Sequence, residues 1–170
     1  MGAGMVDLNA TELPDLAGAV IARAVAAGIM VVTAESCTGG MVAAALTDIA
    51  GASAVLNRGV VTYSNAAKSD LLGVPEAVLM AHGAVSAQTA AAMAEGALQA
   101  APDASMAIAI TGIAGPGGGT DEKPVGLVWF GLAIRGKDTV TTHDIFPGER
   151  KAVRHQAAAM ALAMLKDGIG

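Results

Sequence analysis

The sequence predicts an α/β domain in which helices cover both faces of a mixed sheet. Short β-branched or apolar runs alternate with longer amphipathic segments, and the last two strand-like runs follow one another directly. No linker or internal repeat divides the 170 residues. We therefore expect residues 1–170 to form a single domain, a three-layer α/β/α sandwich with its core over about residues 14–166.

Apolar residues three and four positions apart mark the helices. Leu16 and Val20 follow this spacing in the first helix, and Gly28 stands where a left-handed C-cap would end it. Ser64 and Ser86 stand where N-caps of later helices are expected. Helices are predicted at residues 13–27, 41–49, 65–72, 75–81, 87–100 and 149–166.

Strands are predicted where β-branched, aromatic or Ala/Ile-rich runs have strand length. Residues 53–63 read as two strand-like pieces with a bend at 57–59 between them. The runs at 125–134 and 139–146 are expected to pair as an antiparallel hairpin across the turn at 135–138. Strands are also predicted at 30–34 and 106–110.

The composition argues against several classes of function. The formal charge is −5 with only 10 lysines and arginines, so binding to DNA or RNA is not expected. The first nine residues do not resemble a signal peptide, and no run of about 20 strongly apolar residues occurs, so we expect a cytoplasmic protein without membrane association. The lone cysteine excludes a disulfide within the chain. No His, Cys or carboxylate cluster has metal-ligand spacing, so a metal site is not expected. The Ala-rich helices could pack against a partner subunit, so a homodimer is possible.

The first candidate site is the run of residues 35–40, where a predicted strand gives way to a predicted helix. A nucleophile here would lie at the carboxyl end of a strand, where open α/β sheets usually bind ligands. Free backbone N–H groups at the start of the helix would attract an anion, and Gly39 and Gly40 would let it approach closely. Simple N-capping by Ser36 or Thr38 is the alternative.

Cys37 is a competing nucleophile, because a thiol at a helix N-terminus can have a lowered pKa. A cysteine nucleophile usually needs a histidine base, and His82, His143 and His155 lie in ordinary sequence settings. A lone buried cysteine is also commonly a small apolar residue of the core. The sequence leaves both nucleophiles open and favours Ser36.

The second candidate site is Tyr63 with Lys68. If Tyr63 ends a strand and Lys68 lies one turn into the next helix, both can face one cleft. Desolvation lowers the pKa of a lysine, and a neutral amine beside a serine hydroxyl can activate that hydroxyl. The alternative is a solvated Lys68 and a Tyr63 that packs in the core, since lysines are mostly exposed.

The third candidate site is the glycine-rich segment 111–120, directly after a predicted buried strand. Its backbone N–H groups could hold a phosphate or an oxyanion. It lacks the Gly-Lys-Ser/Thr end of a Walker loop and the spacing of the dinucleotide-binding fingerprint, and a merely flexible loop is the alternative. Arg150 and Arg154, four residues apart, could clamp a phosphate or pair with surface carboxylates.

Together, these segments resemble the CinA C-terminal domain, the family of nicotinamide-mononucleotide deamidases also called PncC. The resemblance covers about residues 14–166 and rests on motifs that occur in the right order, at residues 33–40, 59–68, 82–86, 111–120 and 123–126. Many members carry a large additional domain that resembles molybdopterin-binding proteins, and any activity of that domain is expected to be absent here.

The resemblance implies an amidohydrolase that converts nicotinamide mononucleotide to nicotinate mononucleotide and ammonia, in the recycling of NAD. It implies Ser36 as nucleophile, Lys68 as base, and Tyr63 as a group that orients or relays the proton, with no metal or cofactor. A non-catalytic nucleotide-binding or regulatory module of the same fold is the alternative. The residues expected to bind substrate are Glu35, Thr38, Gly39, Gly40, Thr111, Gly112, Gly117, Gly118, Arg150 and Arg154.

Overall fold

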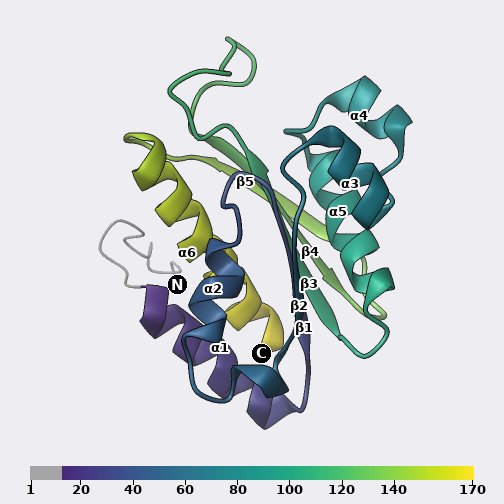
Figure 1. Cartoon of the computed structure of the whole chain (residues 1–170), viewed down its shortest axis with the longest axis vertical. Coiled ribbons are helices and arrows are strands. Elements are labelled where there is room, and N and C mark those ends of the chain that lie inside the picture. Colours follow the sequence, from purple (N-terminus) through teal and green to yellow (C-terminus); the bar gives the residue numbers. More distant parts are fainter. Residues whose placement is uncertain (1–12) are drawn as a thin grey trace, which may run out of the picture.

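Five strands form one mixed sheet between two layers of helices in the computed structural model, which describes residues 13–170 (Figure 1). The strand order is β2-β1-β3-β4-β5. β1 pairs in parallel with both β2 and β3, β4 pairs antiparallel to β3, and β5 pairs antiparallel to β4. The strands are β1 (Val31–Glu35), β2 (Leu56–Val61), β3 (Met106–Gly112), β4 (Leu127–Ile134) and β5 (Val140–Ile145). The predicted α/β class and the mixed sheet are confirmed.

The two helix layers build separate cores on the two faces of the sheet. One layer holds α1 (Leu13–Ala27), α2 (Met41–Thr47) and α6 (Arg150–Ile169), and the other holds α3 (Asn65–Leu72), α4 (Glu76–His82) and α5 (Ala87–Ala100). Side chains alternate along a strand, so β3 serves both cores. Ile108 and Ile110 pack with the first layer, and Ala107 and Ala109 pack with the second.

The predicted N-caps Ser64 and Ser86 and the predicted hairpin of the last two strands are confirmed. The Ser64 side chain accepts a hydrogen bond from the Ala67 N–H, and the Ser86 side chain accepts one from the Thr89 N–H, both at 3.1 Å. The last two strands form the predicted antiparallel hairpin. α6 continues to Ile169, beyond the predicted end at residue 166.

The prediction of two strand pieces in residues 53–63 is wrong. A 3₁₀ turn at Ala52–Ala54 is followed by one continuous strand, β2. The expected bend is instead an irregularity in register, since Val31 pairs with Leu56 and Val32 pairs with Arg58. A bulge of this kind takes up an extra residue without ending the strand.

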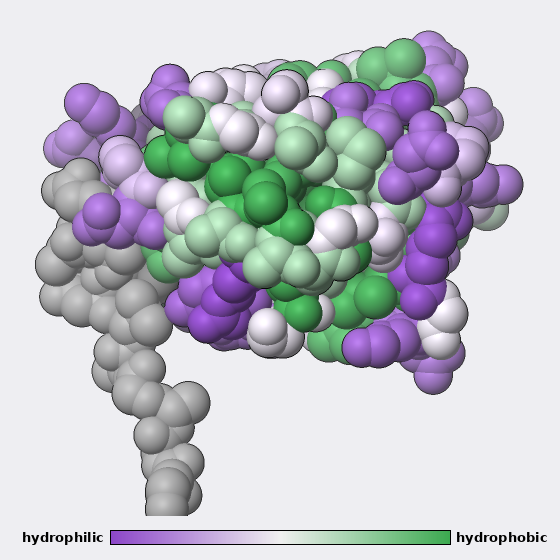
Figure 2. All heavy atoms as spheres, turned by 90° about the horizontal axis from the view of Figure 1, so that it is seen from below, coloured by the Kyte–Doolittle hydropathy of each residue, from purple (hydrophilic) through white to green (hydrophobic). Residues whose placement is uncertain are grey.

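The end of the molecule at the amino ends of the parallel strands is seen from below in Figure 2, where apolar side chains gather at the centre and polar ones surround them. No helix within residues 13–170 is long and apolar enough to cross a membrane. The expectation about a signal peptide concerns residues 1–9, which lie outside the described residues. The homodimer and the absence of nucleic-acid binding stay predictions.

Candidate active site

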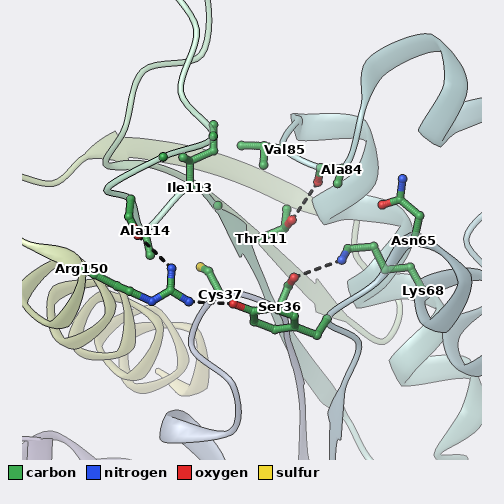
Figure 3. A pocket seen from close by; sticks show the side chains of 15 residues that line it. Ser36, Cys37, Asn65, Lys68, Ala84, Val85, Thr111, Ile113, Ala114 and Arg150 are labelled. Atoms are coloured by element: carbon green, nitrogen blue, oxygen red, sulfur yellow. Dashed lines mark hydrogen bonds between the residues drawn. The ribbon is translucent and has the colours of Figure 1, made fainter.

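The carboxyl ends of the three parallel strands meet around a cavity of about 280 Å³ (Figure 3). Ser36 follows β1, Tyr63 and Lys68 follow β2, and Thr111 lies near the end of β3, so each predicted site contributes to the lining. Parallel strands end at the same edge of a sheet, and for this reason segments far apart in the sequence meet here.

Ser36 and Lys68 point toward one another across the floor of this cavity (Figure 3). The Lys68 Nζ lies 3.0 Å from the Ser36 Oγ and 2.8 Å from the Thr62 carbonyl oxygen. The Lys68 side chain is 1% exposed, and no carboxylate of residues 13–170 lies within ion-pair distance of its amine. The alternative of a solvated Lys68 is therefore wrong.

Burial lowers the pKa of the Lys68 amine below its ordinary value, and Cys37 opposes this shift only in part. A neutral amine has two N–H groups and one lone pair. With one N–H donated to the Thr62 carbonyl, the lone pair can accept the Ser36 hydroxyl proton over the 3.0 Å contact. The geometry therefore suits an amine that acts as a base toward a serine.

The lowered pKa of Lys68 has a consequence for stability. The pKa of this amine is higher in the unfolded chain than in the folded protein, because only the folded protein buries it. The free energy of unfolding of wild type minus that of Lys68→Met is therefore expected to rise with pH, from the lowered pKa up to the ordinary value of 10.5. The slope is at most about 1.4 kcal/mol per pH unit. Urea unfolding of both proteins between neutral pH and about pH 10 measures it, and a flat or falling difference would contradict a buried neutral amine.

The Glu35 carboxylate forms its hydrogen bonds within the protein. Its carboxylate accepts hydrogen bonds from the Thr38 hydroxyl at 2.7 Å, the Val42 N–H at 3.0 Å and the Ala43 N–H at 3.1 Å, and the side chain is buried. The start of α2, where an anion was expected, is thus filled by the protein's own carboxylate. The alternative of N-capping by Ser36 or Thr38 is also wrong, since the N-cap is Gly40 and no side chain caps it.

The turn between β1 and α2 depends on its two glycines. Gly39 and Gly40 have φ angles of 60° and 102°, in the left-handed region that other residues rarely adopt. Neither glycine lines the cavity, and neither do Glu35, Thr38 or Arg154. These five residues form the turn after β1 or contact it. The other residues expected to bind substrate line the cavity: Thr111, Gly112, Gly117, Gly118 and Arg150.

The Cys37 thiol lines the cavity but is only 5% exposed. Burial raises the pKa of this thiol to about 11, against smaller opposite effects of the residue's own backbone, Arg154 and Lys68. The thiol is therefore protonated near neutral pH, and a thiol is a much weaker nucleophile than a thiolate. The structure thus weighs against Cys37 as the nucleophile.

Tyr63 and Arg150 meet at the other side of the cavity. The Arg150 Nη2 donates to the Tyr63 hydroxyl at 2.7 Å, and its Nη1 donates to the Gly115 carbonyl at 2.9 Å. Tyr63 is 61% exposed, so its alternative as a core residue is wrong. In the described chain its hydroxyl has no hydrogen bond to Ser36 or Lys68 through which it could relay a proton.

The glycine-rich segment forms the upper wall. Thr111 donates its hydroxyl hydrogen to the Ala84 carbonyl at 2.7 Å, and Gly112, Gly117 and Gly118 line the cavity. The lining residues Asn65, Ala84 and Val85 and the acceptor role of the Thr62 carbonyl were not predicted from the sequence. All of them lie within the motifs that carried the family resemblance, which was the available signal.

The fold and the site define a three-layer α/β/α domain with a buried serine–lysine pair at the carboxyl ends of its parallel strands. The family model described as "CinA C-terminal domain" matches residues 14–169. The chain belongs to the CinA C-terminal domain family.

Named relatives and solved structures agree with this membership. The protein named nicotinamide-nucleotide amidohydrolase PncC in Escherichia coli (strain K12) is 52% identical over 161 residues, which are 95% of each chain. The protein of the same name in Enterobacter agglomerans is 51% identical over 91% of this chain and 94% of its own. The crystal structure of the competence/damage inducible protein CihA from Agrobacterium tumefaciens matches with a TM-score of 0.87 and 49% identity, over 90% of this chain and 93% of that one.

Proposed function

We propose that this chain is an amidohydrolase that converts nicotinamide mononucleotide and water to nicotinate mononucleotide and ammonia, with Ser36 as nucleophile and Lys68 as base. The observation that carries the proposal is the buried Lys68 amine 3.0 Å from the Ser36 hydroxyl, with no carboxylate partner within residues 13–170. The two relatives named as nicotinamide-nucleotide amidohydrolases, each more than 50% identical, support this substrate. The reaction would serve the recycling of NAD.

In the first half of the reaction, the Lys68 amine takes the proton of the Ser36 hydroxyl while Oγ attacks the carboxamide carbon. The tetrahedral intermediate carries a negative oxygen, which needs hydrogen-bond donors. As the intermediate collapses, the Lys68 ammonium returns the proton to the leaving nitrogen, and ammonia departs. Nicotinate mononucleotide is then bound to Ser36 as an ester.

In the second half, water attacks this ester. The Lys68 amine takes a proton from the water and then gives it to the Ser36 oxygen as the ester bond breaks. Nicotinate mononucleotide leaves with the water's oxygen in its carboxyl group, and both side chains return to their starting states. The Thr62 carbonyl supports both steps, because its 2.8 Å contact holds one N–H and directs the lone pair to Ser36.

Arg150 is the group best placed for the substrate phosphate. It lines the cavity, and its two donors contact a phenol and a carbonyl, neither of which neutralises its charge. In Figure 3 Arg150 and Lys68 lie on opposite sides of Ser36. A mononucleotide could therefore place its phosphate at Arg150 and its carboxamide at Ser36. Tyr63 would orient Arg150 through the 2.7 Å hydrogen bond.

A substrate panel tests this proposal through ammonia release. Wild type is expected to prefer nicotinamide mononucleotide over its riboside and over free nicotinamide. Arg150→Met is expected to raise KM for the mononucleotide by about 10- to 100-fold, because a charge-assisted contact to phosphate contributes about 1.5–3 kcal/mol. Its kcat is expected to change little, since Arg150 touches neither Ser36 nor Lys68.

Lys151→Met is the matched control, because Lys151 is the adjacent exposed cation and does not line the cavity. Its KM is expected to equal that of wild type. Equal rates on the mononucleotide, the riboside and nicotinamide would contradict a phosphate site. Tight binding of the mononucleotide without any ammonia would identify a non-catalytic binding module instead.

A further inference from the structure

Arg154 lies outside the cavity lining and holds the turn that carries Ser36. Its Nε donates to the Cys37 carbonyl at 2.9 Å, and its Nη2 donates to the Thr38 carbonyl at 3.1 Å. A guanidinium is a rigid planar fork, so one side chain fixes two successive peptide units in a single geometry. The contact ties α6 directly to the β1–α2 turn.

The backbone N–H groups of this turn are not all used. The Gly39 N–H donates to the Ser36 carbonyl at 3.0 Å. The N–H groups of Cys37 and Thr38 donate to no other residue of the chain from residue 13 onward. The carbonyl and the N–H of a trans peptide unit point in opposite directions. Arg154 holds the Cys37 carbonyl, so the Thr38 N–H of the same peptide unit points away from Arg154. The Cys37 N–H belongs to the preceding peptide unit, whose Ser36 carbonyl is held by the Gly39 N–H, so Arg154 restrains it through the two peptide units that follow.

We propose that Arg154 is a positioning residue that keeps this turn in the form in which the N–H of Cys37, which donates to no other residue from 13 onward, faces the tetrahedral oxyanion. The inference rests on the proposed amide hydrolysis. Where a nucleophile sits on a strand-to-helix turn, the N–H of the following residue commonly serves as an oxyanion donor. Cys37 is that residue, and it lines the cavity. Such a donor stabilises the transition state only if it is held in place before the reaction.

This role replaces the phosphate contact expected for Arg154 from the sequence. Two of its donors are already used by carbonyl oxygens of the turn, and the side chain is only partly exposed. The two arginines of α6 thus have different contacts: Arg150 lines the cavity, and Arg154 binds the carbonyl groups of the β1–α2 turn.

The split between kcat and KM tests the inference. R154M is expected to lower kcat for nicotinamide mononucleotide by about 10²- to 10³-fold, the cost of losing one oxyanion donor. KM is expected to stay within about twofold, because ground-state contacts are kept. R154K is expected to recover part of kcat, since one ammonium can reach a carbonyl but cannot hold both in a fork. R150M is the comparison variant and is expected to show the reverse split.

Binding measured without turnover separates this inference from the proposed function. Calorimetry on S36A and S36A/R154M is expected to give the same Kd for nicotinamide mononucleotide. A raised KM or Kd with unchanged kcat in R154M would show that Arg154 binds substrate, and unchanged values of both would also overturn the inference. If R154M does not fold, R154K carries the test, and full kcat in folded R154K would overturn it. Absence of both ammonia release by wild type and binding by S36A would reject the proposed function, and this inference with it.

Discussion

Ser36→Ala is expected to lower ammonia release from nicotinamide mononucleotide by about 10⁴-fold or more, the size of effect seen when a nucleophile of a catalytic constellation is removed. Within residues 13–170 the Ser36 hydroxyl is the one hydroxyl that hydrogen-bonds with the buried amine, at 3.0 Å from the Lys68 Nζ. The variant removes one oxygen atom at a site that is 8% exposed, so the fold is expected to be kept. Binding of the mononucleotide is expected to persist, because the proposed phosphate contact is at Arg150 and not at Ser36.

Cys37→Ala is the matched control for this variant. Its thiol is adjacent in sequence and lines the same cavity, but its raised pKa keeps it protonated near neutral pH. Cys37→Ala is expected to keep kcat within about tenfold, with any loss caused by repacking of the turn. Full turnover in Ser36→Ala together with none in Cys37→Ala would show that the nucleophile is assigned to the wrong residue.

Lys68→Met is expected to lower kcat by about 10³-fold or more, because it removes the group that takes and returns the proton. Methionine has similar length and fills the buried space. It leaves the Thr62 carbonyl without its 2.8 Å donor, at a cost of about 1–3 kcal/mol in stability. The variant must therefore be shown to be folded, by circular dichroism and a melting curve, before its kcat is compared with that of wild type.

Lys68→Arg distinguishes a base from a mere cation. Arginine stays protonated in proteins, so it can hold a positive charge near Ser36 but cannot accept the hydroxyl proton. It is expected to be as inactive as Lys68→Met. Activity close to wild type in Lys68→Arg would show that the site needs a positive charge and not a base.

The parts of the site that follow from local pattern were predictable. The turn after β1, the cap at Ser64 and the strand that leads into the glycine-rich segment each have short-range signals. Parallel strands then bring their carboxyl ends together, which places Ser36 near Lys68 without any knowledge of side-chain contacts. The named substrate came from the family resemblance and not from these patterns.

The contacts of Glu35 and Arg154 could not be predicted, because they depend on packing that the local sequence does not specify. A helix rises about 6 Å over four residues. Arg150 and Arg154 share a face of α6, yet one reaches the Gly115 carbonyl and the other reaches Cys37 and Thr38. Only the placement of α6 against the β1–α2 turn separates the two roles.

The burial of Lys68 was also not expected from the sequence. Lysines are mostly exposed, and residues 65–72 show no strong apolar stripe that would mark this position as inward. The side chain is buried because α3 packs against α5, with Leu72 and Val74 in the core, and its amine contacts Ser36 and the Thr62 carbonyl just after β1 and β2. A buried, unpaired amine disfavours the protonated state, and this is the property that the proposed reaction uses.

The role of Lys68 as the base is tested most directly by titration of its amine, measured by NMR of ¹³Cε-labelled lysine, with the resonance identified by its absence in Lys68→Met. We expect a midpoint below the ordinary 10.5 that matches the acid limb of the pH profile of kcat/KM for nicotinamide mononucleotide, since the proposed reaction requires the neutral amine. A midpoint at or above 10.5, in an enzyme that is fully active near neutral pH, would contradict Lys68 as the base.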